Sequence, residues 1–459
     1  MEIERRSIDF IPEEERHGSP KSLFTVWFNA NMTVVTLVTG ALGVTMGLNL
    51  FWCFTAIILG NLIGGIFMAS HSAQGPQLGI PQMIQSRAQF GVIGAIFPII
   101  LVILMYVGFM AANGLLEVDT IKAVLPVSSN SAIIIASILT LIVTFIGYDF
   151  IHSMAKYLSI FSALIFTAVT ILIISQGFPA GAWSPTGGVN FGTFMLFLSI
   201  AAAWQITYAP YVADYARYLP SNTPAKQTFG YTYVGSVLGT VWMMLLGALL
   251  GAAIPDFMDN ASVNIASLFG PYTLIVYIVI FTGLAAGNVL NLYGAFMSTT
   301  TFMISIKEFK VTKRIKFLIL FLAMSAGATI QIFGQGNFMA YYSNLVLLLQ
   351  YFLLPWTAIN LVDYYVMRRG KYSIPDIFDK NGIYGRYNWT SLFTYAATIL
   401  MELPFMTMSF YEGFVSKAMG GADITWVIAL TVPGLLYYLL LKNKVKIQND
   451  QTSDAVVKS

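Results

Sequence analysis

Two carboxamides, Asn288 and Asn291, stand three residues apart within an otherwise apolar stretch. A helix presents residues at this spacing on one face, and each carboxamide offers two N–H donors and one acceptor oxygen. Such a face suits the edge of an amide-like or heteroaromatic ligand. The alternative is interhelical hydrogen bonding, which contributes about 0.6 kcal/mol on average in bilayers. Both interpretations stay open at this point.

An aromatic ring and a carboxamide are paired in the stretch 91–116, where Tyr106 and Phe109 precede Asn113. Phe109 and Asn113 are four residues apart, so a helix places them one turn apart on the same face. Aromatic rings at helical spacing also fill helix interfaces, and this alternative is kept.

Acidic side chains in apolar stretches are rare and indicate either ion pairs or proton sites. Ion pairs are expected near span ends, for Asp214 with Arg217 and for Asp363 with Arg368 or Arg369. Glu402 precedes Pro404 and has no nearby cation, so it is a candidate proton-binding group.

The composition indicates that these residues lie on membrane-spanning helices. Hydrophobic residues make up 57% of the 459 positions and charged residues only 10%, against roughly 25% charged in globular proteins. Windows of about 20 apolar residues match the thickness of a bilayer. They predict twelve spans, at 24–48, 50–70, 91–116, 131–149, 155–176, 191–219, 228–254, 273–305, 315–333, 340–367, 389–412 and 423–441.

The chain has no polar linker, so a single transmembrane domain over 23–441 is expected, with cytoplasmic tails at 1–22 and 442–459. All 24 lysines and arginines except Lys122 and Lys417 lie on the termini, on the connections after even-numbered spans, or at the span ends beside them. The positive-inside rule then places both termini in the cytoplasm, with the protein in the cell membrane.

The first and sixth predicted spans are the most polar and the most interrupted. The first contains Asn29, Asn31, Thr33, Thr36, Thr39, Gly40, Gly43 and Gly47; the sixth contains Gln205, Thr207, Pro210, Asp214 and Arg217. Broken helices in corresponding positions of two inverted halves indicate the central site of a transporter. A five-plus-five inverted repeat is therefore predicted. The alternative for the glycines is close helix packing.

No motif for enzymatic chemistry is present. A phosphate-binding glycine loop with a lysine is missing, and the only histidines, His17, His71 and His152, are far apart in the chain. The single cysteine, Cys53, provides neither a disulfide nor a thiolate metal site. The prediction is a gradient-driven carrier, with no enzymatic activity, no cofactor and no bound metal.

Four ordered segments together resemble the nucleobase–cation symporter-1 family, in its purine–cytosine permease branch. They are EIERRSIDFIPEEERHG at Glu2–Gly18, SAQGPQLGIPQMIQSRAQFG at Ser72–Gly91, YAPYVADYARYLP at Tyr208–Pro220 and PWTAINLVDYYVMRRGKY at Pro355–Tyr372. The resemblance covers nearly the whole chain. It implies an all-α membrane fold with about twelve helices: a LeuT-like core of two inverted five-helix repeats plus two peripheral helices.

The resemblance also implies a substrate site, in which a flat ring lies between aromatic side chains of the third and sixth helices. Phe109 and Asn113 match the aromatic and amide positions of the third helix, and Asn288 and Asn291 match polar positions of the eighth. On the sixth helix three residues match, Trp204, Gln205 and Tyr208, and which of them contacts the substrate depends on where the helix breaks.

Coupling to a proton is favoured over sodium. The similar sodium-coupled hydantoin permease uses hydroxyl groups of the eighth helix, whereas the nearest positions here are Ala285, Ala286 and Gly287. Sodium prefers oxygen ligands, so their loss weakens such a site.

The predicted function is import of a nucleobase, cytosine or a purine, by symport with a proton through alternating access. The alternatives are a sodium-coupled carrier for allantoin, hydantoin or a related ring, and a nutrient receptor without transport. The expected partners are a small planar substrate, a coupling cation and the lipid bilayer. Nucleic acid is not an expected partner, and the sequence leaves the oligomeric state open.

Overall fold

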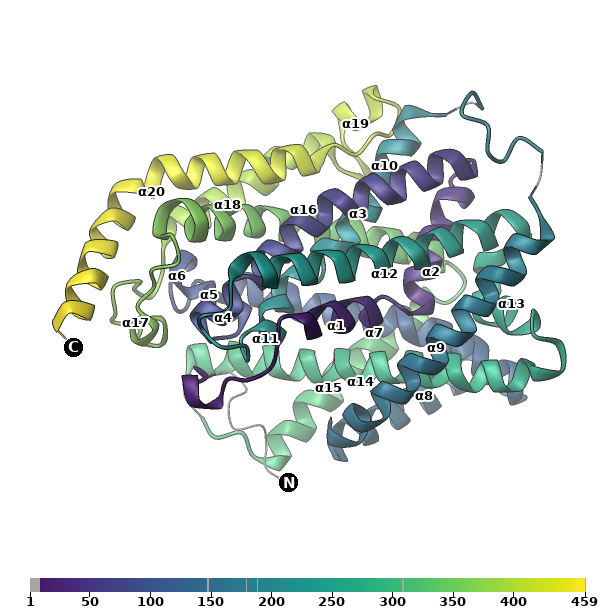
Figure 1. Ribbon diagram of the computed structural model, residues 1–459, viewed down its shortest axis with the longest axis horizontal. Coiled ribbons are helices and arrows are strands. Elements are labelled where there is room, and N and C mark those ends of the chain that lie inside the picture. The colour runs from purple at the N-terminus through teal and green to yellow at the C-terminus, as the bar shows by residue number, and fades with distance from the viewer. Residues whose placement is uncertain (1–8, 147, 179, 188, 308, 459) are drawn as a thin grey trace.

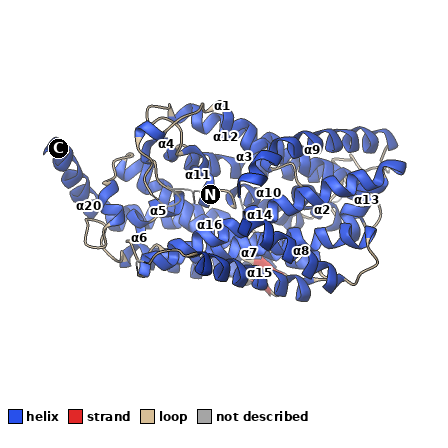
Figure 2. Cartoon of the chain, turned by 90° about the horizontal axis from the view of Figure 1, so that it is seen from below, coloured by secondary structure: helices blue, strands red, loops and turns tan. Residues whose placement is uncertain are grey.

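The long helices of the molecule run side by side along one axis, and short helices gather at both ends (Figures 1 and 2). This architecture comes from a computed structural model, which describes residues 9–146, 148–178, 180–187, 189–307 and 309–458. Within these ranges, ten helices are long and apolar enough to cross a membrane, and one bent pair raises the number to eleven.

The predicted spans correspond to a regular series of helices. They are α1 (Lys21–Ala30) with α2 (Val34–Thr45), α3 (Leu50–Ser72), α7 (Ile96–Val124), α8 (Ser129–Ile146), α9 (Tyr148–Gln176), α10 (Phe191–Ile206) with α11 (Val212–Ala216), α12 (Ala225–Ala253), α14 (Thr273–Ile306), α15 (Lys313–Gly334), α16 (Phe338–Leu361), α18 (Trp389–Glu402) and α20 (Thr425–Lys458).

Shorter elements connect these helices. The short helices are α4 (Gln74–Leu78), α5 (Gln82–Gln85), α6 (Arg87–Phe90), α13 (Ala261–Ser267), α17 (Ile374–Phe378) and α19 (Phe414–Ala418). Single 3₁₀ turns lie at Glu13–Glu15, Ala209–Tyr211, Phe257–Asn260, Gly270–Tyr272 and Leu403–Phe405, and a π-helical segment at Val362–Arg368 continues α16. The strands β1 (Thr407–Met408) and β2 (Tyr411–Glu412) form one antiparallel hairpin.

The first predicted span is broken, as the sequence indicates. Helices α1 and α2 meet at an angle of 61°. Thr33 is extended at the break and its side chain accepts a hydrogen bond from the backbone N–H of Thr36, which satisfies a free donor at the start of α2. The break therefore has a local cause in the sequence.

The sixth predicted span is broken at Pro210, because proline lacks an N–H and its ring collides with the carbonyl four residues earlier. That residue is Ile206, the last residue of α10. The 3₁₀ turn at Ala209–Tyr211 follows, and α11 resumes the helical path.

The eleventh predicted span, 389–412, is helical only as far as Glu402. Pro404 follows two residues later, and the chain passes into a 3₁₀ turn and the β1–β2 hairpin. At 14 residues, α18 falls short of the length needed to cross a bilayer as a straight helix.

The terminal segments are partly built into the fold. Residues 1–8 of the predicted N-terminal tail lie outside the described residues, while the buried Arg16 donates through Nη1 to the carbonyl of Pro76. Helix α20 continues past residue 441, and both Gln448 and Asn449 contact the body of the protein.

Backbone contact between α2 and α12 explains one glycine in each helix. A Cβ atom at Gly40 would lie 1.8 Å from the carbonyl oxygen of Met244, and one at Gly247 would lie 1.7 Å from that of Leu37. Only glycine permits this approach at both positions. Close packing, the alternative interpretation of the first-span glycines, thus applies to Gly40. Elsewhere, α7 packs most extensively against α14, and α10 against α3.

Candidate functional site

Asn31, at the break between α1 and α2, joins the two broken helices. Its Oδ1 accepts hydrogen bonds from Trp204 Nε1 at 2.8 Å and from the Tyr208 hydroxyl at 3.0 Å. Its Nδ2 donates to the carbonyl oxygen of Trp27 at 2.8 Å. The carboxamide is fully buried. A single side chain therefore fixes the end of α10 relative to the end of α1.

Aromatic rings line this junction from α7 and α10. Phe109 lies edge-on to Trp204, with ring centroids 5.8 Å apart, and Trp204 lies edge-on to Tyr208 at 5.9 Å. Perpendicular pairs of this kind are a favoured aromatic geometry. The structure thus brings together the three aromatic residues that the family resemblance selects.

Amide side chains continue the site along α7 and α14. Asn113 is one helical turn beyond Phe109, and its Nδ2 lies 3.2 Å from the position that a Cβ atom of Gly287 would take. The missing side chain at Gly287 therefore leaves room for this carboxamide. Asn291, which lies on α14 one turn beyond Gly287, is half-buried.

Glu117 extends the same face of α7 by one more turn. Its Oε1 accepts a hydrogen bond of 3.0 Å from Nδ2 of Asn288, and the two residues are only 1% and 2% exposed. The Oδ1 of Asn288 is buried and has no hydrogen-bond partner in the described part of the chain. One end of this carboxamide is held and the other is available.

Gln205 points to the opposite side of α10. Its Nε2 donates to Asn61 Oδ1 and to Thr240 Oγ1, both at 3.0 Å, and its Oε1 accepts from Ser236 Oγ at 2.7 Å. These partners lie on α3 and α12. The carboxamide of Gln205 is therefore engaged in the contact among three helices rather than with the aromatic rings.

A pocket lies where the α1–α2 break meets α9 and α14. The broken helix contributes Thr33 and α9 contributes Ser162. From α14 come only Val279, Ile280, Gly283 and Leu284, whose side chains carry no oxygen.

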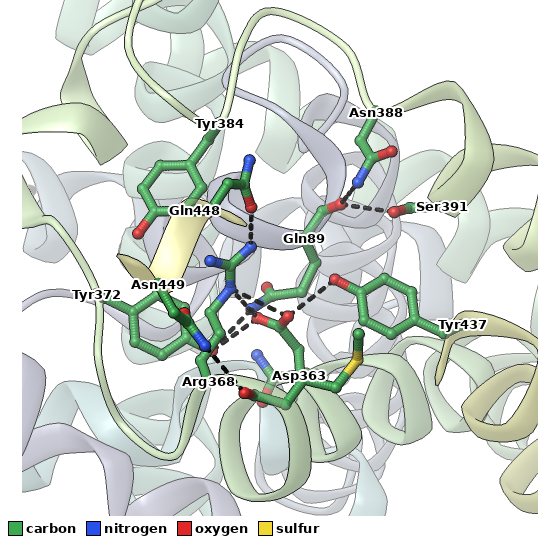
Figure 3. A network of polar contacts seen from close by, with 12 residues as sticks. Gln89, Asp363, Arg368, Tyr372, Tyr384, Asn388, Ser391, Tyr437, Gln448 and Asn449 are labelled. Atoms are coloured by element: carbon green, nitrogen blue, oxygen red, sulfur yellow. Dashed lines mark hydrogen bonds and ion pairs between the residues drawn. The ribbon is translucent and has the colours of Figure 1, made fainter. Parts of the chain in front are cut away.

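A second buried polar cluster, the Asp363 cluster, lies at the end of the bundle that carries α17 (Figures 1 and 3). The fully buried carboxylate of Asp363 accepts hydrogen bonds from Gln89 Nε2 at 2.7 Å, Arg368 Nε at 3.0 Å, the Tyr372 hydroxyl at 2.7 Å and the Tyr437 hydroxyl at 2.9 Å. Arg368 also donates to Gln448 Oε1 at 2.7 Å, and its guanidinium lies 4.9 Å from the ring centre of Tyr384. The predicted ion pair is present and surrounded by further partners.

Sequence reasoning missed Glu117 because the predicted third span ended at residue 116, whereas α7 continues to Val124. A signal was present, since Phe109, Asn113 and Glu117 repeat at intervals of four. Asn31 was one of several polar residues of the first predicted span, and only the folded chain singles it out.

Two discontinuous helices that meet beside aromatic and amide side chains define the class of secondary active transporters with inverted repeats. The solved structures agree with this fold. One of them is MHP1, a nucleobase-cation-symport-1 family transporter, in a closed conformation with bromovinylhydantoin bound. It superimposes on this chain with a TM-score of 0.76 and 18% sequence identity, and the match covers 97% of this chain and 96% of that chain. Its inward-facing conformation gives a TM-score of 0.74 at 19% identity, over 97% and 94% of the two chains.

The chain matches, over residues 10–429, the family model for permeases for cytosine/purines, uracil, thiamine and allantoin, and it belongs to this family. It is 51% identical over 446 residues to the putative purine-cytosine permease YxlA of Bacillus subtilis, covering 97% of each chain. It is 24% identical to the purine-cytosine permease fcyB of Emericella nidulans, over 97% of this chain and 90% of the relative. The protein is a membrane transporter and not an enzyme. The predicted fold and family are confirmed.

Proposed function

We propose that this protein imports cytosine or a purine across the cell membrane by symport with a proton. The observation that carries the proposal is the meeting of Phe109, Trp204 and the amides of α7 and α14 beside the two helix breaks. Alternating access around such a site moves substrate from one side of the membrane to the other. The purine–cytosine permeases among the relatives support the substrate class.

The chemistry of the side chains fits a planar, polar-edged ring. Aromatic faces such as those of Phe109 and Trp204 stabilise a nucleobase by about 1–3 kcal/mol through stacking. We assign the ring edge to Asn113, Asn288 and Asn291, because buried amides reject ligands whose donors and acceptors do not match.

Two residues of the sixth predicted span receive different roles. Tyr208 lies against Trp204 and shares the acceptor Asn31 with it, so it completes the aromatic wall. The carboxamide of Gln205 makes its hydrogen bonds to α3 and α12, and we propose that it supports the aromatic wall from behind.

The pocket at the α1–α2 break favours a proton as the coupling ion. Sodium prefers oxygen ligands, but the side-chain oxygens that line the pocket are those of Thr33 and Ser162, and the α14 residues add none. A proton needs only a titratable group close to the substrate.

The distribution of charge supports both termini in the cytoplasm. Of the lysines and arginines, only Lys122 and Lys417 lie outside the termini, the connections after even-numbered spans and the span ends beside them. Lys122 is at the end of α7 and Lys417 is in α19, which lies at the end of the bundle opposite α17 (Figure 1). The positive-inside rule then puts the α17 end in the cytoplasm.

Uptake of radiolabelled cytosine into proteoliposomes tests the proposal. Uptake is measured first under a proton gradient and then under a sodium gradient. Unlabelled purines, pyrimidines, hydantoin and allantoin are added as competitors. Proton-driven accumulation that nucleobases block is the expected result. If uptake is driven by sodium and is blocked only by hydantoin or allantoin, the protein is instead a sodium-coupled carrier for such rings. Binding without accumulation under either gradient would make the protein a receptor.

A further inference from the structure

We infer that Glu117 carries the coupling proton and that Asn288 transmits its protonation state to the substrate. This inference rests on the proposed proton symport. It assigns the proton to one named side chain, which lies two helical turns from Phe109 on the same face of α7.

The first argument is the combination of burial and missing counter-charge. Glu117 is only 1% exposed. The helices α2, α8, α10, α13, α14 and α16, which pack along α7, contain no Asp, Glu, Lys, Arg or His. Their titratable groups are tyrosines alone: Tyr277 and Tyr293 on α14, and Tyr341, Tyr342 and Tyr351 on α16.

Cations on α7 and α15 do not approach this carboxyl group. Lys122, on the last turn of α7, donates to Ser129 at the start of α8, and Asp119 is half-buried beside that end. On α15 the bases are Lys313, Arg314 and Lys316, all in the first turn. The α15 residue that contacts Gly114 of α7 is Gln331. Lys316 precedes Gln331 by fifteen residues, which corresponds to about 22 Å along α15.

A buried carboxylate without a cation is expensive, so the enclosed form of the site is stable only with Glu117 neutral. When the site opens to water, hydration stabilises the ionised form. Opening and closing of the carrier therefore changes the proton occupancy of this group. That dependence is the physical requirement for a coupling site.

Asn288 links this proton to the substrate. A carboxylate accepts hydrogen bonds roughly twice as strong as a neutral oxygen does, so the ionised Glu117 holds Nδ2 of Asn288 firmly. Protonation weakens that bond and frees the carboxamide to turn towards a ligand, for which its unpartnered Oδ1 is already available. Since the coupling free energy is reciprocal, substrate binding in turn favours protonation of Glu117.

Two other buried carboxyl groups, Asp363 and Glu402, each lack one of these properties. Asp363 is paired with Arg368. Glu402 is buried and has no hydrogen-bond partner in the described part of the chain, but it lies on α18, which packs mainly against α16, α20 and α6. Glu402 is therefore a matched control: a buried glutamate in the same protein that does not contact the site.

The test compares Glu117→Gln with Glu402→Gln in proteoliposomes. Glutamine keeps the size and the acceptor oxygen but does not titrate. We expect Glu117→Gln to lose proton-driven accumulation of cytosine by about tenfold, down to the external level, while exchange of internal for external cytosine stays within about threefold of wild type. Cytosine affinity should also become independent of pH in this variant. Glu402→Gln should accumulate cytosine as the wild type does.

Each other outcome overturns the inference in a distinguishable way. If the wild type does not accumulate cytosine under a proton gradient, the proposed function fails and this inference fails with it. If the wild type and Glu117→Gln accumulate equally, or if Glu402→Gln is the variant that loses accumulation, only the assignment to Glu117 fails. Loss of exchange and binding together would give Glu117 a purely structural role.

A second variant covers the case in which Glu117→Gln does not fold. Glu117→Asp keeps a titratable carboxyl group at a shorter reach. Accumulation with a shifted pH profile supports the assignment, and accumulation with the wild-type profile overturns it.

Discussion

Glu117 and Asp363 are both buried carboxyl groups, yet their surroundings are opposite. Asp363 accepts bonds from an arginine, two tyrosines and a glutamine, and the arginine also donates to Gln448 (Figure 3). Among the described residues the Glu117 carboxyl group accepts one side-chain hydrogen bond, from a neutral carboxamide, and the basic residues of α7 and of the helices that pack along it lie at the far end of α15 or point to α8. The first carboxyl group has a cation and three neutral donors around it, whereas the second has a single neutral donor.

The difference separates a structural cluster from a functional site. In the Asp363 cluster, the end of α16 is tied to the segment before α7 and to α20, so its bonds connect parts of the chain that are far apart in sequence. At the central site, the Glu117–Asn288 pair has no cation partner, and the unpartnered Oδ1 of Asn288 lies beside the aromatic and amide side chains proposed to hold the substrate. The ion-paired cluster is expected to determine stability, whereas the central pair is expected to determine binding.

The largest effect is expected from Asp363→Ala. The substitution leaves Arg368 as an unpaired buried cation, which costs about 3–5 kcal/mol. Unfolding of the purified protein in detergent, followed by helix content during denaturant titration, measures the loss. The double variant Asp363→Leu with Arg368→Leu should recover most of it, because it removes both charges. A double variant as unstable as Asp363→Ala would show that the charge imbalance is not the cause.

Gln205→Leu should lower stability and leave cytosine affinity nearly unchanged. It removes a carboxamide with three bonds to α3 and α12, and the buried partners left behind cost about 1–3 kcal/mol. Denaturant titration and equilibrium binding on the same preparation separate the two properties. A variant with wild-type stability and weakened binding would instead put Gln205 in contact with the substrate.

Phe109→Ala should weaken binding of every planar base by a similar factor, corresponding to about 1–3 kcal/mol of lost stacking. Competition binding with cytosine, adenine and hypoxanthine measures the pattern. Phe393→Ala is the control, because that ring is 68% exposed on α18. Loss of cytosine binding alone would contradict the stacking role.

Asn288→Ala should weaken nucleobase binding about tenfold without preventing membrane expression, since it removes a hydrogen-bonding edge of the site. Binding assays against Asn264→Ala, a half-buried asparagine of α13, give the comparison. Wild-type affinity in Asn288→Ala would remove Asn288 from the site and would also break the proposed link to Glu117.

Local chemistry in the sequence was sufficient to predict both helix breaks. Helix α10 ends at Ile206, four residues before Pro210, and Thr33 caps the start of α2. Both effects act within a single turn, so no knowledge of the neighbouring helices is needed. The end of α18 could have been predicted by the same argument from Pro404, but its hydropathy continues past that residue and extended the predicted span.

The sequence by itself determined the lipid-embedded, all-helical class, the approximate spans, the broken first and sixth helices and the family, because hydropathy, proline and capping are local properties of the chain. Only the tertiary structure decided what each polar side chain contacts. Gln205 and Trp204 are neighbours in sequence, yet a helix turns adjacent residues about 100° apart. One therefore bonds to α3 and α12, and the other bonds to Asn31. The meeting of Glu117 with Asn288 joins residues 171 positions apart, and only the packing of α7 on α14 brings that acid to the amide.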